Sequence, residues 1–86
     1  MKQNVSEVEY RKMKKVIGKN VKKYRRMNQW SQESLAEKMM EHGLDNVSIN
    51  TISCIENGRS LPGLITYLYL SRSFEVSLDS MIKGLG

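Results

Sequence analysis

Few residues in this 86-residue chain have the type and spacing for covalent or metal chemistry. Cys54 is the single cysteine and His42 the single histidine, and no third group stands where it would orient them as nucleophile and base. One cysteine cannot close an internal disulfide, and one cysteine with one histidine leaves a zinc ion short of ligands. The sequence therefore predicts no enzymatic activity, no catalytic residue, no metal site and no cofactor.

The cations are the remaining chemical feature, because lysine and arginine bind phosphate. Residues 1–30 hold ten Lys/Arg against two acids, whereas residues 31–86 hold four against seven. Nine of the cations lie between Arg11 and Arg26, with no acid among them. This density is typical of a surface that faces nucleic acid or an anionic membrane, although a solvated helix face is the plain alternative.

Hydrophobic residues make up 40% of the chain, which suits one small globular domain. Charges interrupt them throughout, so no stretch approaches the roughly 20 apolar residues of a membrane-spanning helix. The N-terminus is polar and basic and lacks an apolar h-region. We therefore expect a cytoplasmic protein without a membrane partner.

A capping box formed by Ser6 and Glu9 can begin the first helix. Its apolar stripe, with spacings of four, four and three, consists of Met13, Ile17, Val21 and Tyr24. Asn28 is expected to end this helix in the left-handed conformation. The pattern leaves open whether residues 6–12 continue the helix, form a separate one or fray.

Ser31 is expected to cap a second helix, which Gly43 ends. Its predicted core face is Leu35, Ala36 and Met39. After a mostly polar connection, Ser48 caps a third helix that ends at Gly58. Ile52 and Ile55 point inward in this third helix, and the residues predicted to face outward are Ile49, Asn50, Ser53 and Cys54.

Pro62 fits the start of a fourth helix, which Leu64 and Leu68 anchor and which runs to about Phe74. A short fifth helix begins at Ser77, with three inward residues: Leu78, Met81 and Ile82. No strand-like alternation competes with these helices. The sequence therefore predicts an all-α bundle over residues 13–86, preceded by an extension over residues 1–12.

Two short helices whose second member presents small polar side chains can enter the roughly 12 Å major groove of DNA. Reading base edges needs short donors, acceptors and methyl groups, while attraction to the duplex can come from cations on a neighbouring helix. The basic first helix and the nearly uncharged third helix suit these two tasks.

Three segments are similar to the phage-repressor, or XRE-type, helix-turn-helix family over roughly residues 16–83: IGKNVKKYRRMNQWSQESLAEKM, VSINTISCIENGRSLP and LITYLYLSRSFEVSLDSMIKG. The matching positions are spread along the chain: Ser31-Gln32-Glu33, Leu35-Ala36, Ile52-Ser53, Glu56-Asn57-Gly58, Pro62, Leu64 and Val76-Ser77-Leu78-Asp79. The resemblance implies a compact, lambda-repressor-like domain of five helices that binds double-stranded DNA.

The resemblance also implies individual roles. Base-reading positions fall on Ile49, Asn50, Ser53 and Cys54. The resemblance places phosphate contacts at Gln32, Asn57, Arg59 and Ser60. Further expected phosphate contacts are Lys22 and Lys23 of the basic helix, with Ser48 and Thr51. Arg25 and Glu56 match a family ion pair, and Glu56 near a negative helix C-terminus needs a cation in any case.

Each role has a structural rival. Gln32, Asn50, Asn57 and Arg59 can be ordinary helix-end or turn residues, and Ile49 either meets a thymine methyl group or packs on the connection. Cys54 fits better as a small residue that makes no base contact. The chain also departs from the family pattern, because the connection after Met39 is about six residues longer than usual.

The segment LITYLYL places apolar side chains in every direction, which is unusual for a surface helix of a small monomer. Its second face, with Ile65 and Tyr69, meets either the N-terminal extension or a second subunit. We favour a homodimer, which would present two recognition helices to DNA half-sites about 34 Å apart.

The leading hypothesis is a sequence-specific DNA-binding transcription regulator, a repressor or autoregulator of a prophage or mobile element. The alternative is an antitoxin-like or other protein-interaction module whose fourth helix binds a protein partner and whose DNA contact is secondary. A membrane-binding role for the first helix is disfavoured, because its apolar stripe is needed for the core.

Overall fold

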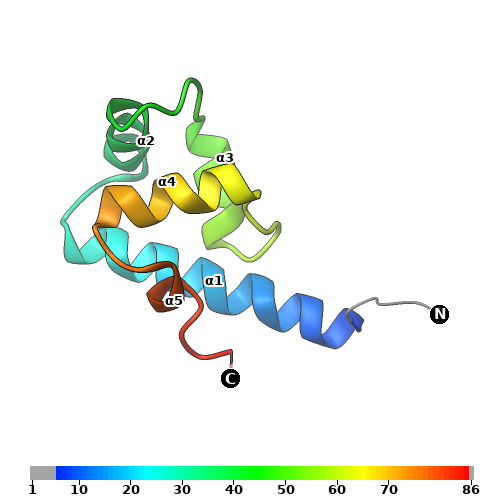
Figure 1. Cartoon of the computed structure of the whole chain (residues 1–86). Coiled ribbons are helices and arrows are strands. Elements are labelled where there is room, and N and C mark those ends of the chain that lie inside the picture. The colour runs from blue at the N-terminus through cyan, green and yellow to red at the C-terminus, as the bar shows by residue number, and fades with distance from the viewer. Residues whose placement is uncertain (1–5, 86) are drawn as a thin grey trace.

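The computed structural model describes residues 6–85, which form five helices and no strand. They are α1 (Glu7–Met27), α2 (Gln32–Glu41), α3 (Ile49–Glu56), α4 (Leu64–Phe74) and α5 (Leu78–Met81). The long α1 runs along the base of the molecule, and α2, α3 and α4 lie over it (Figure 1). The expected all-α, five-helix architecture is confirmed.

The first helix runs without a break from Glu7, so residues 7–12 continue it. The Ser6 hydroxyl oxygen accepts the backbone N–H of Glu9 at 3.2 Å, as the capping box predicts. The Glu9 carboxylate accepts the Ser6 hydroxyl proton at 3.3 Å. Residues 1–5 of the expected extension lie outside the described residues.

Serine caps begin three further helices. Ser31, Ser48 and Ser77 each accept the backbone N–H three residues ahead, at 3.0, 3.1 and 3.1 Å. Each cap satisfies one of the amides that a helix N-terminus leaves without an intrahelical partner. The predicted starts of α2, α3 and α5 are therefore confirmed.

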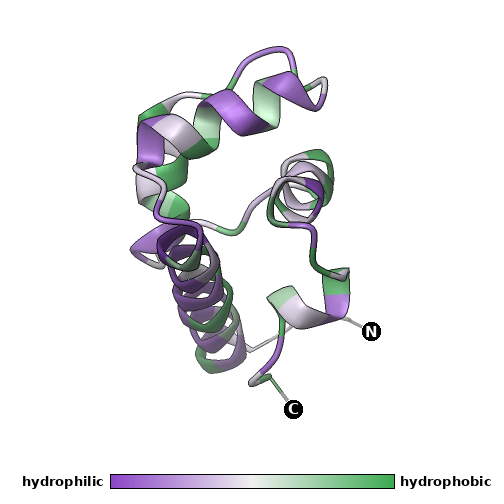
Figure 2. Ribbon diagram, turned by 90° about the vertical axis from the view of Figure 1, so that its left-hand side faces the viewer, coloured by the Kyte–Doolittle hydropathy of each residue, from purple (hydrophilic) through white to green (hydrophobic). Residues whose placement is uncertain are grey.

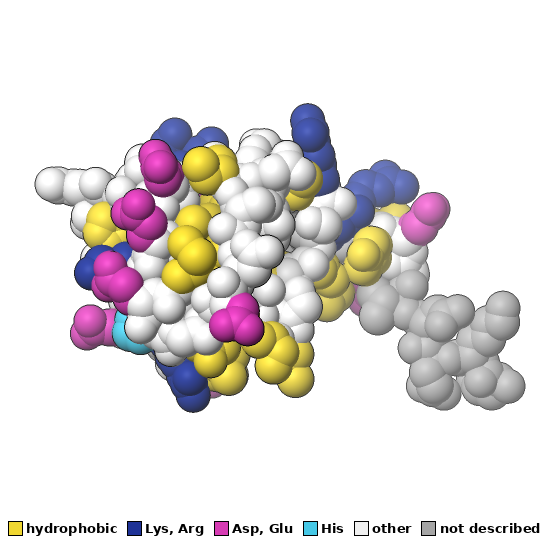
Figure 3. Space-filling model, turned by 90° about the horizontal axis from the view of Figure 1, so that it is seen from above, with side chains coloured by type: hydrophobic (Ala, Val, Ile, Leu, Met, Phe, Trp, Pro, Cys, Tyr) yellow, Lys and Arg dark blue, Asp and Glu magenta, His cyan; other side chains and the backbone are white. Residues whose placement is uncertain are grey.

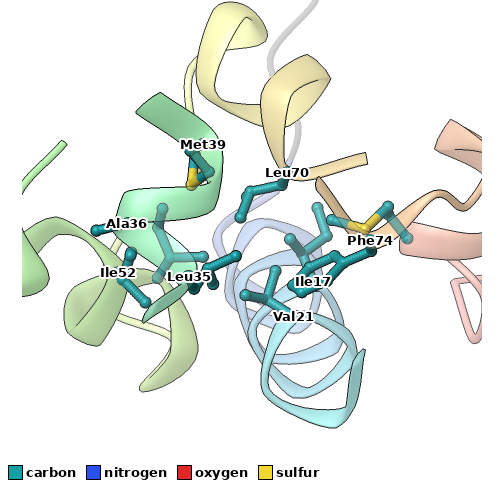
Figure 4. Close-up of a cluster of buried hydrophobic side chains, with 10 residues drawn as sticks. Ile17, Val21, Leu35, Ala36, Met39, Ile52, Leu70 and Phe74 are labelled. Atoms are coloured by element: carbon teal, nitrogen blue, oxygen red, sulfur yellow. The ribbon is translucent and has the colours of Figure 1, made fainter. Parts of the chain in front are cut away.

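One cluster of buried hydrophobic side chains joins all five helices (Figure 4). Its members are Ile17, Val21, Leu35, Ala36, Met39, Ile52, Ile55, Leu70, Phe74 and Met81. The ring of Phe74 packs near those of Trp30 and Tyr24, with centroid distances of 6.1 and 5.7 Å. Figure 2 shows the hydrophobic sides of the helices turned inward and much of the remaining surface of α1 hydrophilic.

Gly18 sets how closely α1 and α3 pack, and the sequence reasoning did not single it out. A Cβ atom at this position would collide with the backbone carbonyl oxygen of Ile55 and lie 2.9 Å from that of Glu56. The two helices can therefore pack at this distance only because residue 18 lacks a side chain. The sequence signal was a glycine inside an otherwise unbroken helical pattern. Glycine at such a position costs about 1 kcal/mol of helix stability relative to alanine, so its presence indicates a packing requirement.

Asn28 caps the end of α1 as expected, but the left-handed conformation predicted for it falls on the next residue. Asn28 has helical dihedral angles, and Gln29 adopts the left-handed conformation with φ of 60°. The Trp30 amide then donates to the Arg25 carbonyl at 3.1 Å, which closes the turn. The left-handed residue of such a turn is the one after the cap, and Asn28 is the cap.

The buried face of α4 also differs from the prediction. Leu64, expected to anchor the helix, is 78% exposed and Leu68 is half-buried, whereas Leu70 and Phe74 are buried. Pro62 precedes the N-cap, Gly63, and so lies outside the helix. A segment this rich in apolar residues has no unique stripe, so its pattern could not select the buried side.

The short α5 is inward only through Met81, because Leu78 and Ile82 are 40% and 38% exposed. Hydrogen bonds hold it in place. Asn20 of α1 donates to the Met81 carbonyl at 2.7 Å, and the Tyr67 hydroxyl of α4 donates to the Leu78 carbonyl at 2.6 Å. The expectation that Leu78 and Ile82 face the core is therefore corrected.

The long connection between α2 and α3 is anchored to the rest of the molecule. Leu44 and Val47 are partly buried against the core, and Tyr69 of α4 faces Gly43, where a Cβ atom would lie 3.5 Å from its hydroxyl oxygen. These contacts tie both ends of the connection to the bundle that also seats α3.

We expect Gly18→Ala to lower the free energy of unfolding by about 1–3 kcal/mol, since the added methyl group meets backbone carbonyls that cannot rotate away. Helix propensity alone predicts the opposite sign, a gain of about 1 kcal/mol. Urea unfolding measures the difference. Lys12→Ala on the exposed side of α1 is the control and should change stability by less than about 0.5 kcal/mol. A stabilised Gly18→Ala variant would contradict the close packing of α1 on α3.

Candidate nucleic-acid interface

The outward side of α3 carries small, uncharged side chains. Ile49 is 47% exposed, Asn50 is exposed, and Ser53 and Cys54 are half-buried. The helix contains no lysine or arginine, and its single acid, Glu56, is buried. The surface of α3 therefore offers amide, hydroxyl, thiol and methyl groups, which suit contacts with base edges in a major groove.

Hydrogen bonds position polar groups at both ends of α3. The hydroxyl oxygens of Ser48 and Thr51 lie 2.9 Å apart at its start. At its end, the side-chain amide of Asn57 donates to the Ser53 hydroxyl oxygen at 3.3 Å. Because Ser53 accepts this bond, its own hydroxyl proton is available to an acceptor outside the protein.

The chain leaves α3 through a tight turn. Gly58 has φ of 72°, its amide donates to the Ile55 carbonyl at 3.1 Å, and the Arg59 amide donates to the Cys54 carbonyl at 2.9 Å. This pair of bonds defines a Schellman motif, in which glycine meets the left-handed conformation without strain. The turn leaves Asn57, Arg59 and Ser60 exposed directly beyond α3.

The buried carboxylate of Glu56 ties α3 to the neighbouring helices. Its Oε2 accepts from Arg25 Nε at 2.6 Å, and its Oε1 accepts from the terminal guanidinium nitrogen of Arg25 at 3.0 Å and from Gln32 Nε2 at 3.1 Å. The second terminal nitrogen of Arg25 donates to the Trp30 carbonyl at 2.8 Å. One side chain thus connects α1, the start of α2 and the end of α3, and the structure brings together Arg25 and Glu56 as the resemblance implies.

This pair is largely shielded from water, since the side chains of Arg25 and Glu56 are 12% and 1% exposed. The hydrogen bonds to Glu56 raise the pKa of Arg25 above its ordinary value, against the opposing effect of burial. The guanidinium remains charged at any working pH. A buried pair with this bidentate geometry fixes the relative positions of its two helices more firmly than a surface ion pair does.

Gln32 is half-buried at the first position of α2, where its amide bonds Glu56. That bond uses one of the two side-chain N–H groups, so the second can donate elsewhere. The free backbone amides at the start of α2 lie in the same region and favour an anion. Gln32 is thus both a structural residue and a group that can meet a phosphate.

The cations of α1 lie on more than one side of the helix. Lys22 is half-buried, and Lys23 is exposed with its ammonium 5.4 Å from the centre of the Tyr24 ring. Two lysines not predicted as site residues, Lys15 and Lys19, line a shallow depression together with Glu56, Asn57 and Gly58. The end of α3 is therefore adjacent to the basic helix.

Several acids lie on α2, away from the row of cations on α1. Figure 3 shows acidic side chains at the end of the upper face where α2 lies, with hydrophobic side chains among them. α2 itself carries three acids, Glu33, Glu37 and Glu41. The acids of α2 are thus separated in space from the cations of α1.

The residues proposed for a dimer contact lie on different parts of α4. Ile65 is 57% exposed, while Tyr69 is half-buried and faces the connection. A second apolar surface, which we call the α4–α5 groove, is lined by Ile17, Leu61, Pro62, Leu64, Tyr67, Leu78, Asp79 and Ile82.

Two kinds of feature are missing from residues 6–85. No helix there is long and apolar enough to cross a membrane. In the same residues, no three His, Cys, Asp or Glu side chains lie close enough together to hold a metal ion.

We expect Arg25→Met and Glu56→Leu each to cost about 3–5 kcal/mol of stability, because each leaves a buried partner without its counter-charge. The double variant should be no less stable than either single variant, since both charges are then gone. Urea unfolding of the four proteins gives the coupling energy. The exposed pair Lys38–Glu41, at 3.4 Å, is the matched control and should couple by less than about 1 kcal/mol. Additive losses at Arg25 and Glu56 would contradict the proposed role of the pair.

The comparisons with known proteins bear on this geometry. The family model described as Helix-turn-helix matches residues 21–81, which include α2, α3, α4 and α5. Neither the comparison with curated proteins nor that with solved structures found a match. The matched family consists of DNA-binding transcription regulators. Since the match covers most of the chain, the protein belongs to the XRE-type helix-turn-helix family.

Proposed function

We propose that the protein is a sequence-specific regulator of transcription that binds double-stranded DNA through α3. The observation that carries the proposal is the uncharged, exposed side of α3 held against a basic α1 by the Arg25–Glu56 pair. A helix that read bases and also carried the phosphate attraction would bind many sequences alike. Separating the two tasks allows discrimination between sequences.

Four side chains of α3 are the proposed base readers. The Asn50 amide suits a bidentate contact with adenine, the Ser53 hydroxyl suits either a donor or an acceptor, and Ile49 suits a thymine methyl group. Cys54 lies on the same side but is half-buried, so it offers a small contact surface. Of the four, Asn50 is expected to contribute most to discrimination, because a bidentate pair is worth about 1–3 kcal/mol.

Phosphate contacts are proposed at several places around α3. Gln32 offers its second amide N–H at the start of α2, and Ser48 and Thr51 offer hydroxyl groups at the start of α3. Asn57, Arg59 and Ser60 lie directly beyond it, and Lys22 and Lys23 add charge from α1. Such contacts fix register on the duplex without reading its sequence.

A domain seated in the major groove blocks other proteins from the same DNA segment. Binding over a promoter would therefore repress transcription without a further activity. Together with the likeness to phage repressors, this supports a repressor or autoregulator of a prophage or mobile element.

Asn50→Ala should weaken binding to a selected DNA site by about 1–3 kcal/mol and leave binding to scrambled DNA nearly unchanged. Lys22→Gln should weaken both equally and reduce the slope of log affinity against log salt by about 1. Fluorescence anisotropy with both duplexes measures these effects, and Asn46→Ala, an exposed asparagine in the connection, is the matched control. Equal losses on both duplexes for Asn50→Ala would contradict base reading by α3.

We also propose that the protein binds DNA as a homodimer through the exposed side of α4. Ile65 is 57% exposed and its neighbour Leu64 is 78% exposed, and Tyr69 can add only its accessible edge. A two-fold dimer would place two copies of α3 on half-sites about 34 Å apart on one face of the duplex.

Ile65→Glu should convert the dimer to a monomer, because the symmetry axis brings two buried carboxylates close together. Val8→Glu changes a comparably exposed apolar residue on α1 and should leave the dimer intact. Light scattering during gel filtration gives the masses. A wild-type monomer at high concentration would remove the homodimer proposal, and a dimeric Ile65→Glu variant would show that Ile65 does not lie in the contact.

The same exposed apolar residues favour a second candidate, an antitoxin-like module that binds a different protein through α4. Co-expression with the protein encoded by the adjacent gene distinguishes the two. A stable complex that Leu64→Glu or Ile65→Glu abolishes, from a chain that is otherwise monomeric, would favour this candidate over the homodimer.

A further inference from the structure

We propose that Lys15 and Lys19, in the N-terminal half of α1, form a phosphate-binding site that extends the DNA contact beyond the end of α3. The proposal rests on the DNA-binding function proposed above and adds to it a part of the chain that precedes the family match, which begins at residue 21. Figure 1 shows this end of α1 projecting past the other helices.

The spacing of the cations places them on one side of α1. Successive intervals of four, four, three and four residues separate Arg11, Lys15, Lys19, Lys22 and Arg26. Residues at these intervals share one face of a helix. At a rise of 1.5 Å per residue, the row is about 22 Å long, and each strand of a duplex carries one charge per about 3.4 Å of its axis. The row can therefore follow a strand over several phosphates.

This row passes the end of α3. A Cβ atom on Gly58 would lie 3.6 Å from the Lys15 Cα atom, so the turn after α3 rests directly on α1. Lys15 and Lys19 line the depression beside it together with the exposed Asn57. A strand that meets Asn57 as it leaves the base-reading side of α3 would next encounter these two lysines.

Glu56 also lines the depression, and its negative charge opposes phosphate binding. Both of its carboxylate oxygens already accept hydrogen bonds, two from Arg25 and one from Gln32. The Arg25 guanidinium neutralises this charge at contact distance. The net charge facing a phosphate is therefore set by Lys15 and Lys19.

The lysines have no evident structural use. The ion pairs found within residues 6–85 join Glu7 with Arg11, Arg25 with Glu56, and Lys38 with Glu41. Like charges at intervals of four residues destabilise a helix by about 0.2–0.5 kcal/mol per pair. The row therefore lowers the stability of α1 in the free protein, and phosphate binding would relieve the repulsion.

The test compares the double variant Lys15→Gln/Lys19→Gln with Lys83→Gln. Lys83 follows α5, and its backbone carbonyl accepts from Asn20, a residue on the opposite side of α1 from the row. Affinity for a mixed-sequence 20-base-pair duplex is measured by anisotropy at several salt concentrations, because phosphate binding needs no operator. Circular dichroism melting reports whether each variant is folded.

The double variant should lose about 10- to 100-fold in affinity at 0.1 M salt, and its salt slope should fall by about 1.8, which corresponds to two phosphates. Its melting temperature should be unchanged or raised. Lys83→Gln should retain the wild-type slope. An unchanged slope in the double variant, or an equal fall in Lys83→Gln, would overturn the proposed site while leaving the DNA-binding function intact. If the wild-type chain binds no duplex even in low salt, the proposed function fails and the site fails with it.

Discussion

The buried carboxylate of Glu56 determines where α3 lies relative to the rest of the molecule. It accepts hydrogen bonds from Arg25 of α1 and Gln32 of α2, while Arg25 also bonds the Trp30 carbonyl between these two helices. Because the carboxylate is buried, it must stay paired with its cation, since an unpaired charge inside the protein would be costly in free energy. Gly18 supplies the complementary condition, since it permits the α3 backbone to approach α1 closely enough for the pair to form. Together the two features fix the direction in which α3 presents its outward side chains.

The proposed base-reading role of α3 accounts for the unequal distribution of charge. A reader that carried its own lysines would be attracted to every phosphate, so small neutral groups on α3 favour selectivity. In the proposed function the attraction comes instead from α1, which the Arg25–Glu56 pair holds beside α3. α1 carries this charge at some cost to its own stability, since its cations repel one another at helical spacing. The core compensates through Ile17 and Val21, which pack α1 against the other helices.

The sequence predicts those helices whose pattern allows only one set of ends and one buried face. Serine caps and glycine stops locate α2 and α3, and Ile52 and Ile55 are buried as their spacing indicates. The buried side of α4 could not be predicted, because Leu64, Leu68 and Leu70 offer several stripes and only the tertiary packing selects Leu70. Gln29 was missed because glutamine rarely adopts the left-handed conformation that the turn imposes on it.

The candidate site likewise contains some features that could be predicted from the sequence and others that could not. The family resemblance predicted the roles around α3, and the structure places Arg25 against Glu56 and exposes Asn50. Local pattern could not reveal that Gln32 also bonds Glu56, or that Lys15 and Lys19 lie beside Asn57, because these contacts join residues 24 to 42 positions apart. This proximity depends on how α1 packs on α3. Gly18 controls that packing, and the pattern of charged residues does not indicate it.

The most direct test of the account is the salt dependence of binding by the unaltered protein to a selected DNA site and to its scrambled counterpart. If α1 supplies the attraction and α3 the discrimination, log affinity should fall steeply with log salt for both duplexes, along nearly parallel lines separated by a constant offset. The slope reports the phosphates bound, and the offset reports the base contacts. Coincident lines, or affinities that do not respond to salt, would contradict the division of tasks between the two helices.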